Sequence, residues 1–90
     1  MTNEATARDL AAKALIFIAQ DPDRIGRFLA LSGTGPADIR EQAEDPMFLG
    51  GILDHLLMDE ALLVEFANWV EIAPSAVAEQ RLHLPGAMPI

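Results

Sequence analysis

Four polar residues near the middle of the chain, Asp54, His55, Asp59 and Glu60, form the group that most resembles a chemical site. His55 and Asp59 are four residues apart, so one helix face could offer an imidazole and a carboxylate to a metal ion. Zinc would need a further protein ligand, and His83 is the only other histidine. We therefore predict solvated helix-end residues and no metal ligands. An enzyme or metal-binding protein that uses Asp54, His55 and Asp59 remains an alternative.

Other catalytic patterns are missing from the sequence. The chain has no cysteine, which excludes disulfides and thiolate ligands. Neither Ser32 nor Ser75 has a histidine beside it in sequence, and there is no nucleophile elbow, phosphate-binding loop or dinucleotide fingerprint. We expect no catalytic residue, no cofactor-binding residue and no cofactor, and we predict that the protein is not an enzyme.

Charge is distributed unevenly along the chain. Through residue 40 five acidic residues balance five basic ones, whereas from residue 41 onward nine acidic residues face Arg81 alone, so the net charge of −8 belongs to the second half. Nucleic acids and anionic membranes are held by cationic side chains, and we expect no direct binding to either. The acidic half is either a solvated surface that favours solubility or a surface for a basic protein.

If the acidic half does recognise a partner, its helices should present a surface to that protein. The expected members of the surface are Asp54, Asp59, Glu60, Glu65 and Trp69. Trp69 is the single tryptophan, and it is either a core residue or a partly exposed anchor, since aromatic residues concentrate at binding hot spots.

Helices must position these residues, because nothing in the sequence alternates at period two for long enough to form a strand. Capping residues and prolines mark the helix starts at Thr6 with Asp9, at Asp21-Pro22, at Asp45-Pro46, at Asp59 and at Pro74. The first helix should begin between Asn3 and Thr6 and end near Gln20, and the last should end near His83. We predict an all-α protein with a compact single domain of five or six short helices over residues 1–83. A disordered tail is predicted over residues 84–90, which hold two prolines and a glycine.

A repeat with an offset of 38 residues runs through the chain. It places Asp21 on Asp59, Phe28 on Phe66 and Pro36 on Pro74. We interpret this as two pseudo-repeated helical units that cover each other's apolar faces, with Phe28 and Phe66 as equivalent core residues. A shorter match at an offset of 24 competes with it, and chance combined with helical periodicity is the alternative explanation of the longer one.

Gly50 and Gly51 lie inside an apolar helical segment, where each costs about 1 kcal/mol relative to alanine. Ala12 occupies the position that corresponds to Gly50 in the other unit. Small residues at both positions suggest a close helix crossing. The alternatives are a kink or late helix start at this point, and a functional groove.

Two proline-containing turns, before Pro36 and before Pro74, have the outline of a helix-turn-helix. The helices that follow lack the basic and amide side chains that read DNA, so we interpret the turns as structural corners. A helix-turn-helix relative or an acidic DNA mimic remains as a nucleic-acid-related alternative.

Three segments, ALIFIAQDPDRIGRFLALSG, PADIREQA and DPMFLGGILDHLLMDEALLVEFA, resemble a family of small bacterial all-helical proteins known only as a domain of unknown function. The match runs from about Ala14 to Ala67, with weaker similarity through Val77. The resemblance implies a small helical cytoplasmic protein and brings no activity, cofactor or catalytic residue.

Composition points to a partner. Half of this short chain is apolar, 51% of 90 residues, so some apolar surface should stay exposed after folding. No apolar stretch approaches the length of about 20 residues that a membrane span needs. We expect a cytoplasmic protein-protein interaction module, with a basic protein or a second copy of the chain as partner.

Overall fold

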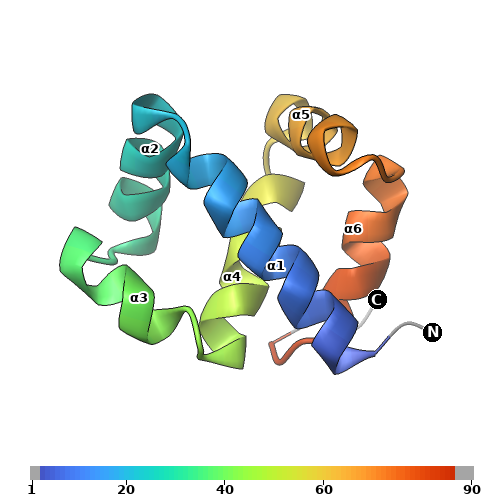
Figure 1. Cartoon of the computed structure of the whole chain (residues 1–90), viewed down its shortest axis with the longest axis horizontal. Coiled ribbons are helices and arrows are strands. Elements are labelled where there is room, and N and C mark those ends of the chain that lie inside the picture. The colour runs from blue at the N-terminus through green and yellow to red at the C-terminus, as the bar shows by residue number, and fades with distance from the viewer. Residues whose placement is uncertain (1–2, 87–90) are drawn as a thin grey trace.

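Helices account for the regular structure of the computed structural model, which describes residues 3–86 (Figure 1). In chain order the elements are α1 (Glu4–Ala19), α2 (Pro22–Ser32), the 3-10 turn η1 (Pro36–Asp38), α3 (Ile39–Gln42), α4 (Pro46–Leu57), α5 (Glu60–Val70) and α6 (Pro74–Arg81). No strand occurs in this part of the chain. The predicted all-α class with five or six short helices is confirmed.

Local hydrogen bonds fix most helix starts, as the sequence predicts. Asp21, Asp45 and Asp59 accept hydrogen bonds through their carboxylates from backbone N–H groups in the first turns of α2, α4 and α5. Helix α2 ends at Gly33, whose φ of 74° is the left-handed conformation that glycine adopts without strain. These boundaries depend on neighbouring residues only, which is why they can be read from the sequence.

Helix α1 has its predicted bounds, whereas α6 ends slightly earlier than predicted. Asn3, not Thr6, caps α1: its Oδ1 accepts a hydrogen bond from the Thr6 backbone N–H at 2.9 Å. The Asn3 backbone is extended and its side chain is as good a cap as threonine, so α1 begins at Glu4, within the predicted range from Asn3 to Thr6. Helix α6 ends at Arg81, two residues before the predicted His83.

Helices α1 and α4 pack together at the centre, with α2 and α3 on one side of the pair and α5 and α6 on the other (Figure 1). Helix α5 begins and ends 38 residues after α2. The same offset separates Pro36, the first residue of η1, from Pro74, the first residue of α6. The first unit is therefore α1, α2 and η1 with α3, and the second unit is α4, α5 and α6. The arrangement of the elements follows the sequence offset.

Phe28 and Phe66 are core residues, as predicted, with exposed fractions of 2% and 0%. Each contacts the central helix of the other unit. Phe28 lies edge-on to Phe48 of α4 with ring centroids 5.9 Å apart, and Phe66 contacts Phe17 of α1 at 5.6 Å. The two units thus close one shared core around α1 and α4.

The segment after α6 is folded against the domain as far as it is described. Leu84 is buried, and its carbonyl oxygen accepts a hydrogen bond from Arg81 Nη1 at 3.0 Å. The buried Arg81 guanidinium thus binds the carbonyl groups of the first two residues of the predicted tail, Leu84 and Pro85. The rest of the predicted tail, residues 87–90, lies outside the described residues.

Gly50 and Gly51 have different surroundings in the folded chain. A Cβ atom on Gly50 would lie 3.0 Å from the Arg81 guanidinium, whereas nothing lies within 4 Å of a Cβ atom on Gly51. The close approach predicted here is made by a side chain and not by the backbone of a crossing helix. Helix α4 runs from Pro46 to Leu57 without interruption, so the alternative of a late helix start is wrong.

Substitution of each glycine by alanine should separate these two roles. Gly51→Ala should raise the free energy of unfolding by about 1 kcal/mol, because alanine has the higher helix propensity and the added methyl group meets open space. Gly50→Ala gains the same propensity but pushes a methyl group against a buried guanidinium held by four hydrogen bonds, and we expect a net loss of stability. Urea denaturation of the two variants measures the difference. Equal stabilisation by both would contradict this account of Gly50.

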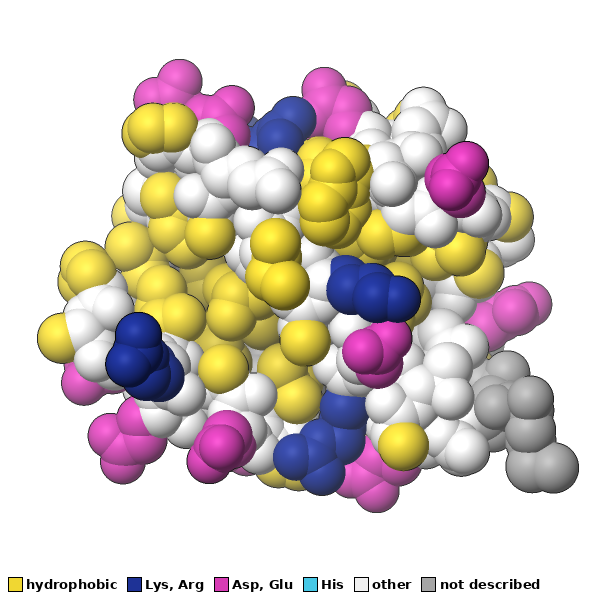
Figure 2. All heavy atoms as spheres, in the orientation of Figure 1, with side chains coloured by type: hydrophobic (Ala, Val, Ile, Leu, Met, Phe, Trp, Pro, Cys, Tyr) yellow, Lys and Arg dark blue, Asp and Glu magenta, His cyan; other side chains and the backbone are white. Residues whose placement is uncertain are grey.

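Hydrophobic side chains remain visible on the surface between α1, α2 and α3, while acidic side chains lie scattered around the edge of the same face (Figure 2). The large hydrophobic residues that are exposed are Ile16, Leu31, Met47, Met58, Val64, Trp69 and Leu82. Within residues 3–86 no single helix is long and apolar enough to cross a membrane, and α5 with α6 passes that test only as a pair bent by 98°.

Candidate binding cleft

The acidic residues of the predicted partner surface do not lie together as free charges. Three of them pair with arginines: Asp54 with Arg81 (2.7 Å), Glu65 with Arg24 (2.7 Å) and Asp59 with Arg27 (3.8 Å). Glu60 has no ion pair among residues 3–86. Folding brings the arginines of α2 beside α5, so at these residues the charge separation seen along the chain is not found in space.

Trp69 is 43% exposed, which agrees with the alternative of a partly exposed residue and not with the alternative of a core residue. Its ring packs on Phe17 at 5.4 Å and on Phe66 at 6.3 Å between centroids. The Arg24 guanidinium lies 4.2 Å above the Phe17 ring and extends this cluster. One part of the indole is therefore packed on the core and the other part faces solvent.

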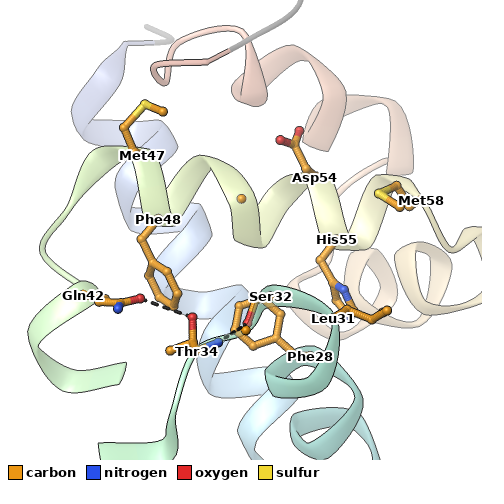
Figure 3. A pocket seen from close by; sticks show the side chains of 12 residues that line it. Phe28, Leu31, Ser32, Thr34, Gln42, Met47, Phe48, Asp54, His55 and Met58 are labelled. Carbon is orange, nitrogen blue, oxygen red and sulfur yellow. Dashed lines mark hydrogen bonds between the residues drawn. The ribbon is translucent and has the colours of Figure 1, made fainter. Parts of the chain in front are cut away.

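The side chains of Asp54 and His55 point to different sides of α4, although the two residues are neighbours in sequence (Figure 3). Asp54 points toward Arg81, whereas the His55 ring lies edge-on to Phe28 at 5.1 Å. Burial lowers the pKa of His55, the nearby Arg27 charge lowers it further, and Asp59 opposes both effects. Within residues 3–86 no three histidine or carboxylate side chains are placed to share a metal ion.

An open cleft lies between α2, the turn that follows it, α3 and α4 (Figure 3). Its volume is about 560 Å³. Phe28 and Phe48 form an apolar wall, and Gly51 adds backbone without a side chain. His55 is the titratable side chain that faces Phe28 here, and its lowered pKa favours the neutral imidazole near pH 7.

The rim of the cleft is apolar and exposed. Leu31, Met47 and Met58 have exposed fractions of 66%, 58% and 84%. At one side the Thr34 hydroxyl donates a hydrogen bond to Gln42 Oε1 at 3.3 Å and ties the turn after α2 to α3. The cleft can therefore hold an apolar group of appreciable size, and its side chains include no arranged nucleophile and base.

Reasoning from the sequence missed Leu31, Met47, Phe48 and Met58 as candidate binding residues. In the sequence each of them looks like an ordinary apolar residue of a helix. Helix periodicity shows which face of a helix is apolar, but it does not show whether another helix covers that face. Of the residues singled out in the sequence, Asp54 and His55 line the cleft, and the Asp54 carboxylate is already paired with Arg81.

Comparison with known proteins adds a family but no activity. No curated protein and no solved structure matches the chain. A family model does match, over residues 4–87, and its description is "Protein of unknown function (DUF3572)". That match extends the resemblance noted in the sequence to nearly the whole chain, including the segment after α6 that packs on Arg81. The chain belongs to the DUF3572 family of proteins of unknown function.

Proposed function

We propose that this protein is an interaction module that holds an amphipathic helix of a basic partner protein in the cleft. The observation that carries the proposal is the exposed apolar rim, in which Leu31 and Met58 lie beside the aromatic wall and Met47 lies at the start of α4 with its Sδ and Cε turned toward Gly86. Exposed apolar surface of this kind marks interaction sites, and flexible methionines adapt to the side chains of a partner. Grooves lined in this way commonly take the apolar face of a helix.

The length of the cleft sets the length of the partner. Met47 and Met58 stand near the two ends of α4, 11 residues apart in sequence, which is about 16 Å along a helix. A partner helix lying along α4 would therefore place about three turns over the cleft. Apolar side chains spaced three and four residues apart on one face would meet Phe28, Phe48 and the methionines.

Charge selects a basic partner over a second copy. Glu44 precedes Met47 and Glu60 follows Met58, and neither forms an ion pair among residues 3–86, so an acidic residue flanks each end of the apolar stretch of α4. Lysine or arginine residues on either side of an apolar helix face would complement them and would speed association at low salt. A second copy carries the same net charge of −8 and would be repelled.

The other functions considered from the sequence have less support. A nucleic-acid reader needs cationic side chains along its groove, and the cleft offers a histidine whose pKa is lowered. An acidic DNA mimic needs free carboxylates in a regular array, whereas Asp54, Asp59 and Glu65 pair with arginines.

Photo-crosslinking from within the cleft tests the proposal. A photoreactive phenylalanine analogue replaces Met47 or Met58 in the protein expressed in its native cells, and the crosslinked peptides are identified by mass spectrometry. The same analogue at Leu82, which is also exposed but does not line the cleft, is the matched control. We expect both cleft positions to capture one polypeptide through a basic, amphipathic segment, and we expect Leu82 not to capture it.

A variant that fills the cleft tests whether the crosslinked polypeptide binds there. Gly51→Trp adds an indole where a side chain meets open space, and it should abolish the crosslinks while the circular dichroism spectrum stays helical. Capture of a second copy of the chain would overturn the proposed occupant and favour a dimer. Equal capture from Leu82, or capture that survives Gly51→Trp, would overturn the proposed binding site.

A further inference from the structure

Each of the two units contributes to a pair of contacting aromatic rings at equivalent positions, tilted by 57° between Phe66 and Phe17 and edge-on at 80° between Phe28 and His55. At the offset of 38, Phe28 corresponds to Phe66 and His55 corresponds to Phe17. The Phe28 and His55 ring centroids are 5.1 Å apart, and those of Phe66 and Phe17 are 5.6 Å apart. Each pair joins the second helix of one unit to the central helix of the other. The second unit therefore serves as an internal reference for the cleft in the first.

In the second unit an indole covers the aromatic pair. Trp69 lies 5.4 Å from Phe17 and 6.3 Å from Phe66 between ring centroids. Leu31 holds the corresponding position in the first unit, and it is 66% exposed at the rim of the cleft. Leucine is smaller than tryptophan, so no ring reaches the Phe28–His55 pair from the position of Trp69, and Phe48 contacts Phe28 edge-on from α4 at 5.9 Å.

Two further residue differences between the units leave the space beside Phe28 and His55 unfilled. Ser32 and Thr34 stand in the first unit where Val70 and Ile72 stand in the second. Ile72 packs against the core cluster, whereas Thr34 turns its hydroxyl toward Gln42. The first unit thus has polar groups at positions where the second has apolar side chains that extend its core.

The third helix of the second unit, α6, is packed against the domain more extensively than its counterpart in the first unit, α3. Helix α6 packs on α1, α4 and α5, whereas α3 makes its most extensive contact with the adjoining η1. Arg81 holds α6 in place by lying over Gly50 and binding Asp54. The corresponding residues of the first unit are Ala43, Ala12 and Ile16, which cannot form an ion pair. Within residues 3–86 no ion pair joins α3 to the central helices, and Arg8 of α1 donates a hydrogen bond only to the carbonyl oxygen of Glu44, beyond the end of α3. The cleft remains beside α3.

We infer that the cleft contains a subsite for one aromatic side chain, by preference tryptophan, supplied by the partner helix and placed on Phe28 and His55 as Trp69 is placed on Phe66 and Phe17. This inference rests on the proposed function and specifies the anchor residue of the same basic partner. Aromatic rings favour offset and edge-to-face packing on other rings. A neutral imidazole also keeps one nitrogen free to accept a hydrogen bond, which an indole N–H can donate and a phenyl ring cannot.

Two small probes test the subsite without the partner. N-acetyltryptophanamide and, as the aliphatic control, N-acetylleucinamide are titrated into the intact chain while the methyl signals of Met47 and Met58 and the ring signals of His55 are followed by NMR. We expect saturable shifts at these three residues with the tryptophan probe, at millimolar concentrations suited to so small a ligand, and much weaker binding of the leucine probe.

The variant Leu31→Trp copies the second unit by supplying the ring from the chain itself. It should weaken binding of N-acetyltryptophanamide by about tenfold or more, because the subsite is already filled. Leu82→Trp makes the same exchange at an exposed leucine outside the cleft and should leave the affinity unchanged. If Leu31→Trp fails to fold, Gly51→Trp closes the cleft from α4 instead.

The outcomes separate the subsite from the proposed function. Equal binding of both probes, shifts spread over the surface, or unchanged binding in a folded Leu31→Trp or Gly51→Trp would overturn the aromatic subsite. Photo-crosslinking of a basic helix from Met47 and Met58 could still succeed in that case, and the proposed function would stand. Tryptophan binding without any crosslinked polypeptide would support the subsite and overturn the helix-binding function.

Discussion

Truncation of Phe66 to alanine should lower the free energy of unfolding by about 3–5 kcal/mol, the range found for large aromatic deletions in protein cores. The ring is completely buried and packs between Phe17 of the first unit and Trp69 of its own. Its loss would leave a cavity enclosed by side chains of both units, which the surrounding helices can fill only in part. Urea denaturation with linear extrapolation measures the effect.

Phe28→Ala tests the same prediction at the equivalent position. We expect a large loss again, but toward the lower end of about 3–5 kcal/mol, because the space left by this ring joins the open cleft and can admit water. Met58→Ala at the rim is the control and should change stability by less than about 0.5 kcal/mol. A loss below about 1 kcal/mol in Phe66→Ala would contradict the shared core of the two units.

Removal of the Asp54 carboxylate should also lower the free energy of unfolding, by about 3 kcal/mol. Arg81 is only 6% exposed, and Asp54 accepts hydrogen bonds from its Nε at 2.7 Å and its Nη2 at 3.0 Å. Asp54→Ala would leave a buried guanidinium with the carbonyl groups of Leu84 and Pro85 as its described partners. A buried charge without its counter-ion is far more costly than the loss of the pair as a whole.

A double-mutant cycle isolates this interaction. Arg81→Met keeps much of the buried stem but removes the charge, so the double variant Asp54→Ala/Arg81→Met should be less destabilised than the sum of the single variants. Glu65→Ala breaks an ion pair of the same 2.7 Å length between Glu65 and Arg24 at a more exposed site, and it should cost less than about 1 kcal/mol. Equal costs for Asp54→Ala and Glu65→Ala would show that the burial of Arg81 has no energetic consequence.

Arg81 also explains why the second unit is closed and the first unit retains a cleft. The single basic residue of the acidic half closes the second unit by joining α6, α4 and the segment after α6. The first unit has Ala43 at the corresponding position and retains a cleft. One ion pair thus accompanies the difference between a closed structural half and an open half with a candidate binding surface.

Much of the fold could be predicted because it depends on local interactions. Asp21, Asp45 and Asp59 cap helices within three residues of their own position, and Gly33 ends α2 through its own backbone conformation. The repeat at 38 residues predicted the shared register of the helices and the burial of Phe28 and Phe66. Capping, periodicity and repetition are properties of short segments or of their order, so the sequence by itself determined them.

Tertiary packing decided which surfaces stay open and which charges stay free. Arg81 and Asp54 are 27 residues apart in sequence, and Arg24 and Glu65 are 41 apart, so no local pattern shows that they meet. Exposure of Leu31, Met47 and Met58 depends on which elements pack over them, which is a balance of contacts from several helices. The same apolar stripe on a helix becomes core where a neighbour covers it and becomes a binding cleft where none does, because burial is a property of the assembled helices and not of any one of them.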